Sequence, residues 1–227
     1  ASSHTAEGKI EYQLKFSVLV KGLFCGTLIH MITEPSWKSY VVETAEPVLT
    51  PDQCDEIIRI GRNEKVLNAT IGTQDEDDTL YRKSNISWIP FADALPIYQI
   101  ITKWMEVTNN NYFGFDNMQL SEQGQYAEYK KGGFYNWHMD SNVEMSSMPT
   151  VRKISMTLLL SDPSDFSGGE LVLFNGGKLD DANEGAKFEL KRGHAIFFAS
   201  FLLHKVNPVI GGNRKSLVMW FGGTPLK

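Results

Sequence analysis

The C-terminal half of the chain carries short apolar runs separated by glycines and prolines. Within these runs apolar and polar positions alternate, which predicts strands, because successive side chains of a strand point to opposite faces. Strands with no helix between them are typical of a sandwich or barrel, so a mainly β fold is expected in this half. The eight predicted strands cover residues 119–129, 134–141, 153–161, 169–174, 186–191, 194–199, 203–209 and 215–222.

The N-terminal half shows the periodicity of helices instead. Residues 50–53 combine a capping threonine, a proline suited to the first helical position and a glutamine that completes a capping box, so a helix is expected from there to Gly61. Apolar side chains recur at helical spacing over residues 95–107, which predicts a second helix. Residues 85–89 alternate and end before a proline, as a strand does.

Three stretches flank or interrupt these elements. Residues 1–30 are expected to be a leader or N-terminal extension, followed by a single domain over residues 31–227 with its β core at about 119–223. The apolar stretch 16–32 alternates like a strand, and it is too short and too interrupted by polar residues to cross a membrane. The charged stretch 72–83 favours a solvated surface loop, with a lid over a substrate as the alternative.

Composition narrows the class of protein. The chain has 227 residues, of which 42% are hydrophobic and 22% charged, and this fits one large domain. A formal net charge of -5 gives no reason to expect a general nucleic-acid binder. Cys25 and Cys54 are too few for a disulfide framework, so reduced thiols in a cytoplasmic protein are expected. We expect a monomer with no nucleic-acid or membrane partner.

Candidate chemistry begins in the aromatic-rich stretch 129–140. Aromatic residues favour strands, and residues two apart in a strand share a face, so His138 and Asp140 are expected side by side. His204, late in the chain, is a candidate third ligand. Two imidazoles and one carboxylate are the ligand set of non-haem Fe(II) oxygenases, although the same set can hold zinc with a water. A His-x-Asp pair alone is weak evidence, because it also arises by chance.

Arg214 stands shortly after His204 and before a strand that contains Trp220. A buried arginine beside a metal can clamp a carboxylate, because its planar guanidinium binds two oxygens at once. A co-substrate with two carboxylate ends would then span the site, with one end on the metal and the other on Arg214. A surface arginine near a turn is the alternative.

Together these residues resemble a known family. The chain is similar, over about residues 119–223, to the Fe(II)/2-oxoglutarate-dependent dioxygenases of the prolyl 4-hydroxylase-like branch. This resemblance implies a double-stranded β-helix (jelly-roll) core supported by N-terminal helices. It rests on Tyr129, Gly132, His138 and Asp140, the run from Arg152 to Leu160, the motif Gly168-Gly169-Glu170-Leu171, and Gly193, His204, Arg214 and Trp220.

The resemblance also implies roles for residues of the predicted centre. His138, Asp140 and His204 would be the iron ligands. Arg214 would pair with the distal carboxylate of 2-oxoglutarate, a position at which many eukaryotic prolyl hydroxylases have lysine.

Further roles concern the co-substrate. Tyr129 would hydrogen-bond it, with a packed core tyrosine as the alternative. Leu159 stands where some prolyl hydroxylases have another tyrosine that binds the co-substrate, which makes the distal pocket less polar. Thr157 is a candidate to supply a hydroxyl group instead.

Substrate-binding candidates follow from the same resemblance. Arg152 matches a position that holds the peptide substrate in family members, with a surface arginine at a strand end as the alternative. Trp220 is expected to pack beside the metal pocket, and Tyr135 could line a substrate groove, although aromatic residues in strands more often serve packing.

The function implied is hydroxylation of a C–H bond, preferably in a prolyl residue of a peptide or protein. 2-Oxoglutarate and O2 would be consumed with release of succinate and CO2, and ascorbate is a further candidate cofactor. Two alternatives stay open: hydroxylation of a free amino acid, small molecule or other side chain, and a non-catalytic binding module on the same fold. A zinc hydrolase is less favoured, since no general base is evident near the ligands.

Overall fold

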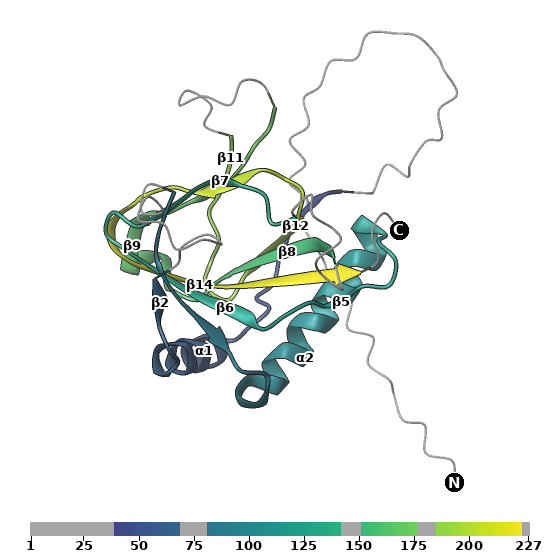
Figure 1. Cartoon of the computed structure of the whole chain (residues 1–227), viewed down its shortest axis with the longest axis horizontal. Coiled ribbons are helices and arrows are strands. Elements are labelled where there is room, and N and C mark those ends of the chain that lie inside the picture. The colour runs from purple at the N-terminus through teal and green to yellow at the C-terminus, as the bar shows by residue number, and fades with distance from the viewer. Residues whose placement is uncertain (1–38, 69–80, 142–150, 177–184, 224–227) are drawn as a thin grey trace.

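The fold is mainly β, with two antiparallel sheets that face each other and two helices outside them (Figure 1). The computed structural model describes residues 39–68, 81–141, 151–176 and 185–223. The predicted leader lies outside these ranges, as do residues 72–80 of the predicted loop. The architecture is a double-stranded β-helix supported by helices from the N-terminal half, which confirms the predicted fold class.

The larger sheet has nine strands, in the order β1-β12-β8-β14-β6-β4-β2, with β5 and β9 also paired to β14. Its strands are β1 (Val41–Glu43), β2 (Leu67–Asn68), β4 (Asn85–Ile89), β5 (Gln119–Leu120), β6 (Gly124–Lys130), β8 (Val151–Leu159), β9 (Phe166–Gly168), β12 (Ala195–Ala199) and β14 (Val209–Gly223).

The smaller sheet has five strands, in the order β11-β10-β13-β7-β3. They are β3 (Arg82–Lys83), β7 (Phe134–His138), β10 (Leu171–Leu173), β11 (Ala186–Phe188) and β13 (His204–Val206).

Helix α1 (Pro51–Asn63) begins where the capping pattern predicts. The Gln53 backbone N–H donates to Thr50 Oγ1 at 3.3 Å, and the Thr50 N–H donates to Gln53 Oε1 at 2.9 Å, so the capping box is complete. The buried face of the helix includes Cys54, a free thiol with 0% exposure. Burial raises the pKa of this thiol to about 11.

Helix α2 (Phe91–Thr108) starts four residues earlier than predicted. Pro90 precedes it, and Ala94 has non-helical dihedrals (φ -133°, ψ 22°), so two helical segments join at a kink just before Pro96. A short π-helix, Asn109–Phe113, continues from its end. The side chains that face the sheet include Ile97, Ile101 and Met105.

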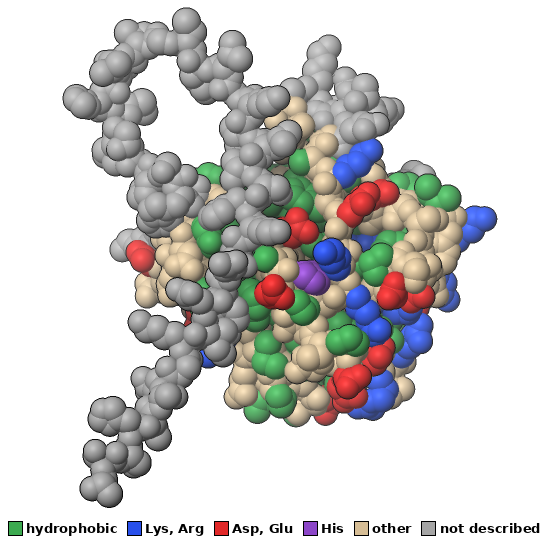
Figure 2. Space-filling view, turned by 180° about the vertical axis from the view of Figure 1, so that it is seen from behind, with side chains coloured by type: hydrophobic (Ala, Val, Ile, Leu, Met, Phe, Trp, Pro, Cys, Tyr) green, Lys and Arg blue, Asp and Glu red, His purple; other side chains and the backbone are tan. Residues whose placement is uncertain are grey.

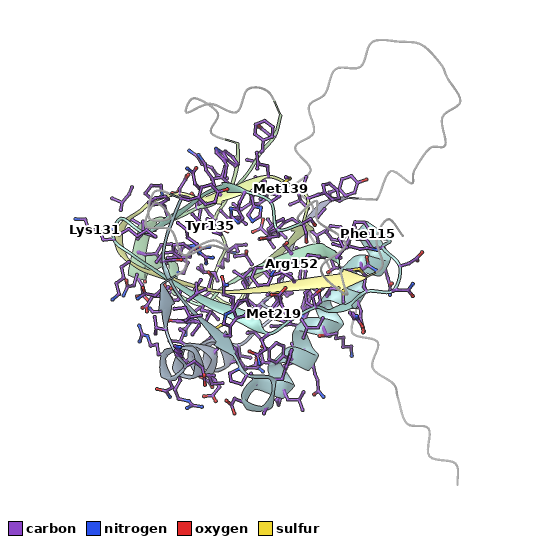
Figure 3. The ribbon with its side chains drawn as sticks, in the orientation of Figure 1. Phe115, Lys131, Tyr135, Met139, Arg152 and Met219 are labelled. Carbon is purple, nitrogen blue, oxygen red and sulfur yellow. The ribbon has the colours of Figure 1, made fainter. Side chains whose placement is uncertain are left out.

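Two hydrophobic clusters divide the core. One lies between the helices and the larger sheet, and it includes Met156 and Met219 from the outer faces of β8 and β14. The other lies between the two sheets and includes Tyr129, Leu159 and Phe198. In Figure 3, Met219 lies on the helix side of β14, whereas Arg152 lies on the side that faces the smaller sheet. The functional side chains discussed below occupy this inter-sheet space.

Several strand boundaries differ from the sequence-based expectation. The predicted strand 119–129 is divided into β5 and β6, because β5 pairs with the end of β14 while β6 pairs with residues 213–218. Strand β14 starts at Val209 rather than at residue 215, since Gly212 (φ +71°) lets the strand bend and pair with β9. Arg82 and Lys83 belong to a strand although a loop was predicted there, and pairing with β7 accounts for this.

The surface gives no sign of an extended basic patch on the face shown in Figure 2, where acidic and basic side chains are interspersed. Within the described ranges, no helix has both the length and the apolar character needed to span a membrane.

Candidate metal centre and its buried arginine

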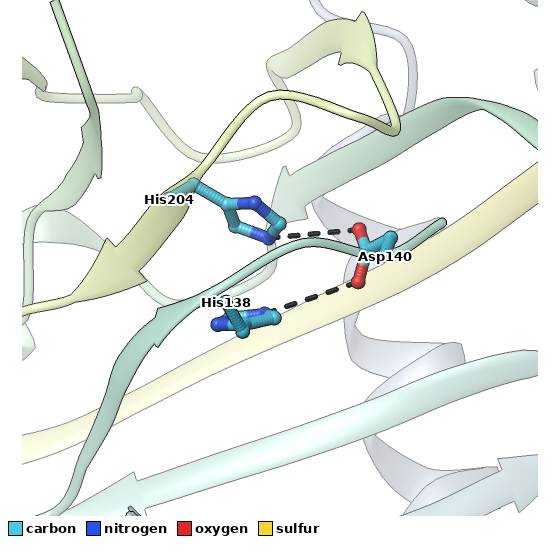
Figure 4. A group of neighbouring side chains, drawn as sticks. All are labelled: His138, Asp140 and His204. Atoms are coloured by element: carbon cyan, nitrogen blue, oxygen red, sulfur yellow. Dashed lines mark ion pairs between the residues drawn. The ribbon is translucent and has the colours of Figure 1, made fainter. Parts of the chain in front are cut away.

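His138 and Asp140, which are two residues apart, meet His204 from much later in the chain between the sheets (Figure 4). His138 ends β7, His204 begins β13, and these two residues are direct partners in the β7–β13 pair. Asp140 Oδ1 lies 3.8 Å from His138 Nε2, and Asp140 Oδ2 lies 3.5 Å from His204 Nε2. One candidate ligand atom from each residue lies within 4.8 Å of the others, which is the spacing that one metal ion could bridge.

The backbone conformation that places Asp140 at this centre differs from the expected strand. The predicted strand 134–141 ends at His138, and Asp140 lies in the bend that follows. The N–H groups of Asp140 and Ser141 both donate to the Ser200 carbonyl, at 3.0 and 3.1 Å. Met139 points away and is 55% exposed. The two side chains are therefore adjacent as predicted, but the bend rather than a continuous strand holds the carboxylate.

Both imidazoles are oriented by backbone carbonyls. His138 Nδ1 lies 2.8 Å from the Asn136 carbonyl oxygen, and His204 Nδ1 lies 2.9 Å from that of Leu202. A carbonyl oxygen only accepts, so each Nδ1 carries the proton and each Nε2 presents a lone pair to the centre. This is the arrangement in which histidine binds metals in proteins.

The Asp140 carboxylate is held from the larger sheet. Ser155 Oγ on β8 donates to Asp140 Oδ2 at 2.6 Å and shares a further hydrogen bond of 2.9 Å with Ser200 Oγ. Burial raises the pKa of Asp140, but His204 and His138 together with the Ser155 hydroxyl outweigh this effect and lower the pKa below its usual value. Asp140 is therefore an ionised ligand candidate.

The donor set fits a divalent transition metal. Burial, with a further contribution from His204, lowers the pKa of His138 to about 3, so its imidazole is neutral at physiological pH. Two imidazoles and an ionised carboxylate on one face leave the opposite coordination positions open, as in non-haem Fe(II) sites.

Arg214 lies deeper between the sheets, on β14, and is 3% exposed. Its Nη1 donates to Ser216 Oγ at 3.1 Å. Burial lowers the pKa of Arg214, with Tyr129 and Glu170 opposing the effect. Arg214 also lines a pocket of about 190 Å³, whose other walls include Leu159.

No carboxylate of the described residues forms an ion pair with Arg214. An unpaired buried charge is costly, which suits a guanidinium that receives its counter-ion from a ligand. The turn at Gly169 (φ +71°) makes room for this side chain, because a Cβ atom there would approach Arg214 Cδ to 2.9 Å. The structure thus places Arg214 inside the fold, rather than at the surface near a turn.

The two co-substrate candidates, Tyr129 and Thr157, both lie on the larger sheet. Tyr129 on β6 pairs directly with Arg214 on β14, and its ring centroid lies 5.6 Å from the guanidinium carbon. Thr157 is two residues beyond Ser155 on β8 and therefore shares its face, the one that carries the contact to Asp140. Both side chains are buried, with exposures of 2% and 6%.

The candidates for substrate binding lie at the metal end. Arg152 forms two hydrogen bonds of 2.7 Å with the Glu122 carboxylate, and its guanidinium lies 4.0 Å from the Trp220 ring centroid. Trp220 pairs with Ser155, and its buried indole N–H has no hydrogen-bond partner. This N–H also contributes slightly to the lowered pKa of Asp140, although the two groups do not form a hydrogen bond. Arg152 is thus neither an isolated surface arginine nor free of a counter-ion.

Several residues near the site were not singled out from the sequence, among them Ser155, Ser200, Glu122 and Arg82. Ser155 could have been found, because it alternates with the apolar residues Ile154 and Met156 in a strand and therefore points to the opposite, inner face. Glu122 and Arg82, which contact Arg152 and Tyr135 respectively, could not, since no local pattern links residues so far apart.

Comparison with known proteins finds similarity to one family over part of the chain. Residues 124–222 match the family model of the 2OG-Fe(II) oxygenase superfamily. A PKHD-type hydroxylase of Idiomarina loihiensis is 39% identical over 92 residues, which are 40% of this chain and 38% of that protein. A PKHD-type hydroxylase of Colwellia psychrerythraea is 37% identical over 94 residues, covering 41% and 40% of the two chains. The matches thus span about two fifths of the length of these curated relatives.

Solved structures share the fold over most of the chain. A viral collagen prolyl hydroxylase from Paramecium Bursaria Chlorella virus-1, in its 2OG complex, has a TM-score of 0.60 at 22% identity and covers 82% of this chain and 97% of its own. A Pseudomonas putida prolyl-4-hydroxylase has a TM-score of 0.59 at 22% identity, with coverages of 82% and 93%. A Trichoplax adhaerens prolyl hydroxylase in complex with a hypoxia inducible factor peptide fragment has a TM-score of 0.60 at 16% identity, with coverages of 81% and 84%.

Proposed function

We propose, from the match of residues 124–222 to the family model of the 2OG-Fe(II) oxygenase superfamily, that the chain is an Fe(II)- and 2-oxoglutarate-dependent dioxygenase. His138, Asp140 and His204 would hold the iron, and Arg214 would bind the distal carboxylate of 2-oxoglutarate. One observation carries the proposal: the His138/Asp140/His204 cluster lies in the same inter-sheet space as a buried guanidinium that forms no ion pair with the described residues.

The overall reaction balances without another reactant. 2-Oxoglutarate, O2 and a substrate C–H bond give succinate, CO2 and a C–OH group, with one oxygen atom entering succinate and the other the product. Iron, when bound, supplies the activation of O2 that no amino-acid side chain provides.

The residues of the chain bind and orient the reactants. Arg214 fixes one end of the co-substrate by a two-pronged ion pair, and the hydroxyl groups of Tyr129 and Thr157 are available along the route between the ends. Ser155 and Ser200 hold the Asp140 carboxylate in place. Apolar side chains of the inter-sheet cluster, such as Phe198, keep water from the reacting groups.

We further propose a prolyl residue in a peptide or protein as the substrate. Three solved structures with this fold are named as prolyl hydroxylases, and one of them holds a peptide. Arg152, Trp220 and Tyr135 would contact the substrate at the metal end. The indole ring of Trp220 offers a flat apolar surface to a pyrrolidine ring. The guanidinium of Arg152, which is paired with Glu122, packs on this indole and holds it in place.

The test is succinate release with Fe(II), ascorbate and a panel of proline-containing peptides, alongside free amino acids. Wild-type protein should release succinate in proportion to peptide that gains one oxygen atom on proline. His138→Ala should release none above background, and His194→Ala should retain turnover, because His194 lies outside the centre and contacts the Thr44 carbonyl. Equal succinate release by wild type and His138→Ala would refute the dioxygenase. Turnover of free amino acids alone would refute only the prolyl substrate.

A further inference from the structure

Tyr135 packs directly on the candidate ligand His138, although a regular strand would separate them. Both belong to β7, and residues three apart in a strand normally point to opposite faces. Here the rings are stacked, with centroids 3.5 Å apart and planes at 14° (Tyr135 is labelled in Figure 3). The cause is a register shift: His138 pairs with His204, while Tyr135 pairs with Val206. Between these two pairs, β7 therefore contains one residue more than β13, which is a β-bulge. This bulge puts both rings on the inner face.

Arg82 contacts the same tyrosine and ties it to the other sheet. Its guanidinium carbon lies 4.3 Å from the Tyr135 ring centroid. Its Nε donates to Ser84 Oγ at 2.8 Å, and its Nη2 donates to Gln125 Oε1 at 2.9 Å. Arg82 lies on β3 of the smaller sheet and Gln125 on β6 of the larger one. The guanidinium therefore links the two sheets at the point where the tyrosine meets the histidine.

We propose that Arg82 and Tyr135 are positioning residues that hold the His138 imidazole in its metal-binding orientation. This inference rests on the proposed function, because it requires His138 to bind the metal. The hydrogen bond to Asn136 fixes one atom of the imidazole, and a flat ring at stacking distance fixes its plane. A metal ligand has to be held within about 10–20° of its productive orientation, which one hydrogen bond alone does not guarantee.

The other histidine is held differently. The rings of His204 and Phe198 pack edge to face, with centroids 4.7 Å apart and planes at 65°. Among the described residues, no cation lies over the Phe198 ring. Phe198 belongs to β12, in the middle of a regular strand pair. His138 instead follows a bulge in β7, next to the edge strand β3, and is not backed by a regular strand pair of this kind. The stack of Arg82, Tyr135 and His138 restricts the orientation of the imidazole in its place.

The test measures Co(II) binding to the metal-free full chain by its visible absorption, together with the thermal unfolding midpoint of the metal-free protein. Tyr135→Leu removes the flat ring at similar size, and Arg82→Lys keeps the charge but loses the fork that reaches Ser84 and Gln125. Tyr135→Phe keeps the ring. Lys83→Met, an exposed neighbour on the same strand, is the matched control.

We expect Co(II) binding to weaken about tenfold in Tyr135→Leu and severalfold in Arg82→Lys, with altered absorption bands, as is usual when a group that orients a ligand is removed. Tyr135→Phe and Lys83→Met should stay within about twofold of wild type. If Tyr135→Leu does not fold, the Arg82→Lys comparison decides. Wild-type affinity and spectrum in Arg82→Lys would overturn the positioning role. Failure of the wild-type protein itself to bind Co(II) or Fe(II) would instead overturn the proposed function.

Discussion

The two ends of the inter-sheet space are built on opposite principles. At the metal end, each candidate ligand already has its hydrogen-bond partner: a backbone carbonyl for each histidine and Ser155 for Asp140. At the far end, Arg214 has a single hydroxyl partner and no carboxylate among the described residues. One end is therefore oriented in advance, whereas the other holds a buried charge that forms no ion pair with the described residues and is suited to a carboxylate ligand. Substitutions at the metal end should accordingly weaken metal binding, whereas substitution of Arg214 should weaken co-substrate binding without lowering the stability of the ligand-free protein.

The largest effect is expected at the metal end. His204→Gln removes one of the three candidate ligands, so Co(II) or Fe(II) binding should weaken by more than the roughly 10- to 100-fold that is typical when a group that holds a ligand in place is removed. Titration of the metal-free protein measures this. The matched control is His194→Gln, which should bind metal as wild type does. Comparable metal binding by His204→Gln and wild type would contradict the assignment of the centre.

Arg214→Met should impair co-substrate binding without lowering the free energy of unfolding of the ligand-free protein. The loss of a buried charge pair with the co-substrate, about 2–5 kcal/mol, should raise the KM for 2-oxoglutarate roughly thirtyfold or more. The ligand-free protein should be unchanged or more stable by about 1–4 kcal/mol, because an uncompensated buried charge is replaced by an apolar side chain of similar length. Steady-state kinetics and chemical denaturation measure the two effects. A strongly destabilised variant would mean that Arg214 already has a counter-ion in the folded chain.

Ser155→Ala sharpens the comparison at the metal end. It removes the donor to Asp140 Oδ2 with little change in volume, so metal affinity should fall about tenfold. The KM for 2-oxoglutarate at saturating metal should stay near the wild-type value, since Ser155 lies away from Arg214. A change in KM without a change in metal affinity would place Ser155 in co-substrate binding instead.

The smallest effect is expected outside both ends. Thr50→Ala breaks the capping box of α1 and should lower the free energy of unfolding by about 1 kcal/mol. Metal affinity and the KM for 2-oxoglutarate should not change. Denaturant titration measures the first quantity, and the assays above measure the others. A change in metal affinity here would show that stability alone alters the centre, and the other variants would then need correction for it.

Local chemistry explains what the sequence could predict. The capping box of α1 and the strand Asn85–Ile89 are determined by residues close in sequence, and both lie where they were expected. The fold class followed from alternation and from the resemblance. The separation of His204 from His138 and Asp140 by several strands did not hide it, because the residue types themselves suggested a centre.

Other features depend on contacts that no local pattern encodes. The bend that carries Asp140 is held by the carbonyl of Ser200, and the bulge in β7 exists only relative to β13. The glycines before residue 215 resembled a strand break, whereas pairing with β9 makes them part of β14. Arg82 belongs to a charged stretch whose composition favours a loop, and only its contact with Tyr135 shows a connection to the centre.

The buried thiol on α1 has a practical bearing on redox experiments. Cys54 is fully enclosed and its pKa is raised to about 11, so its nucleophilic thiolate form is scarce at neutral pH. Iron, ascorbate and oxygen together generate oxidants, but this sulfur is chemically protected from them. Thiol reductants, which chelate cobalt, are therefore not needed to preserve Cys54 during titrations.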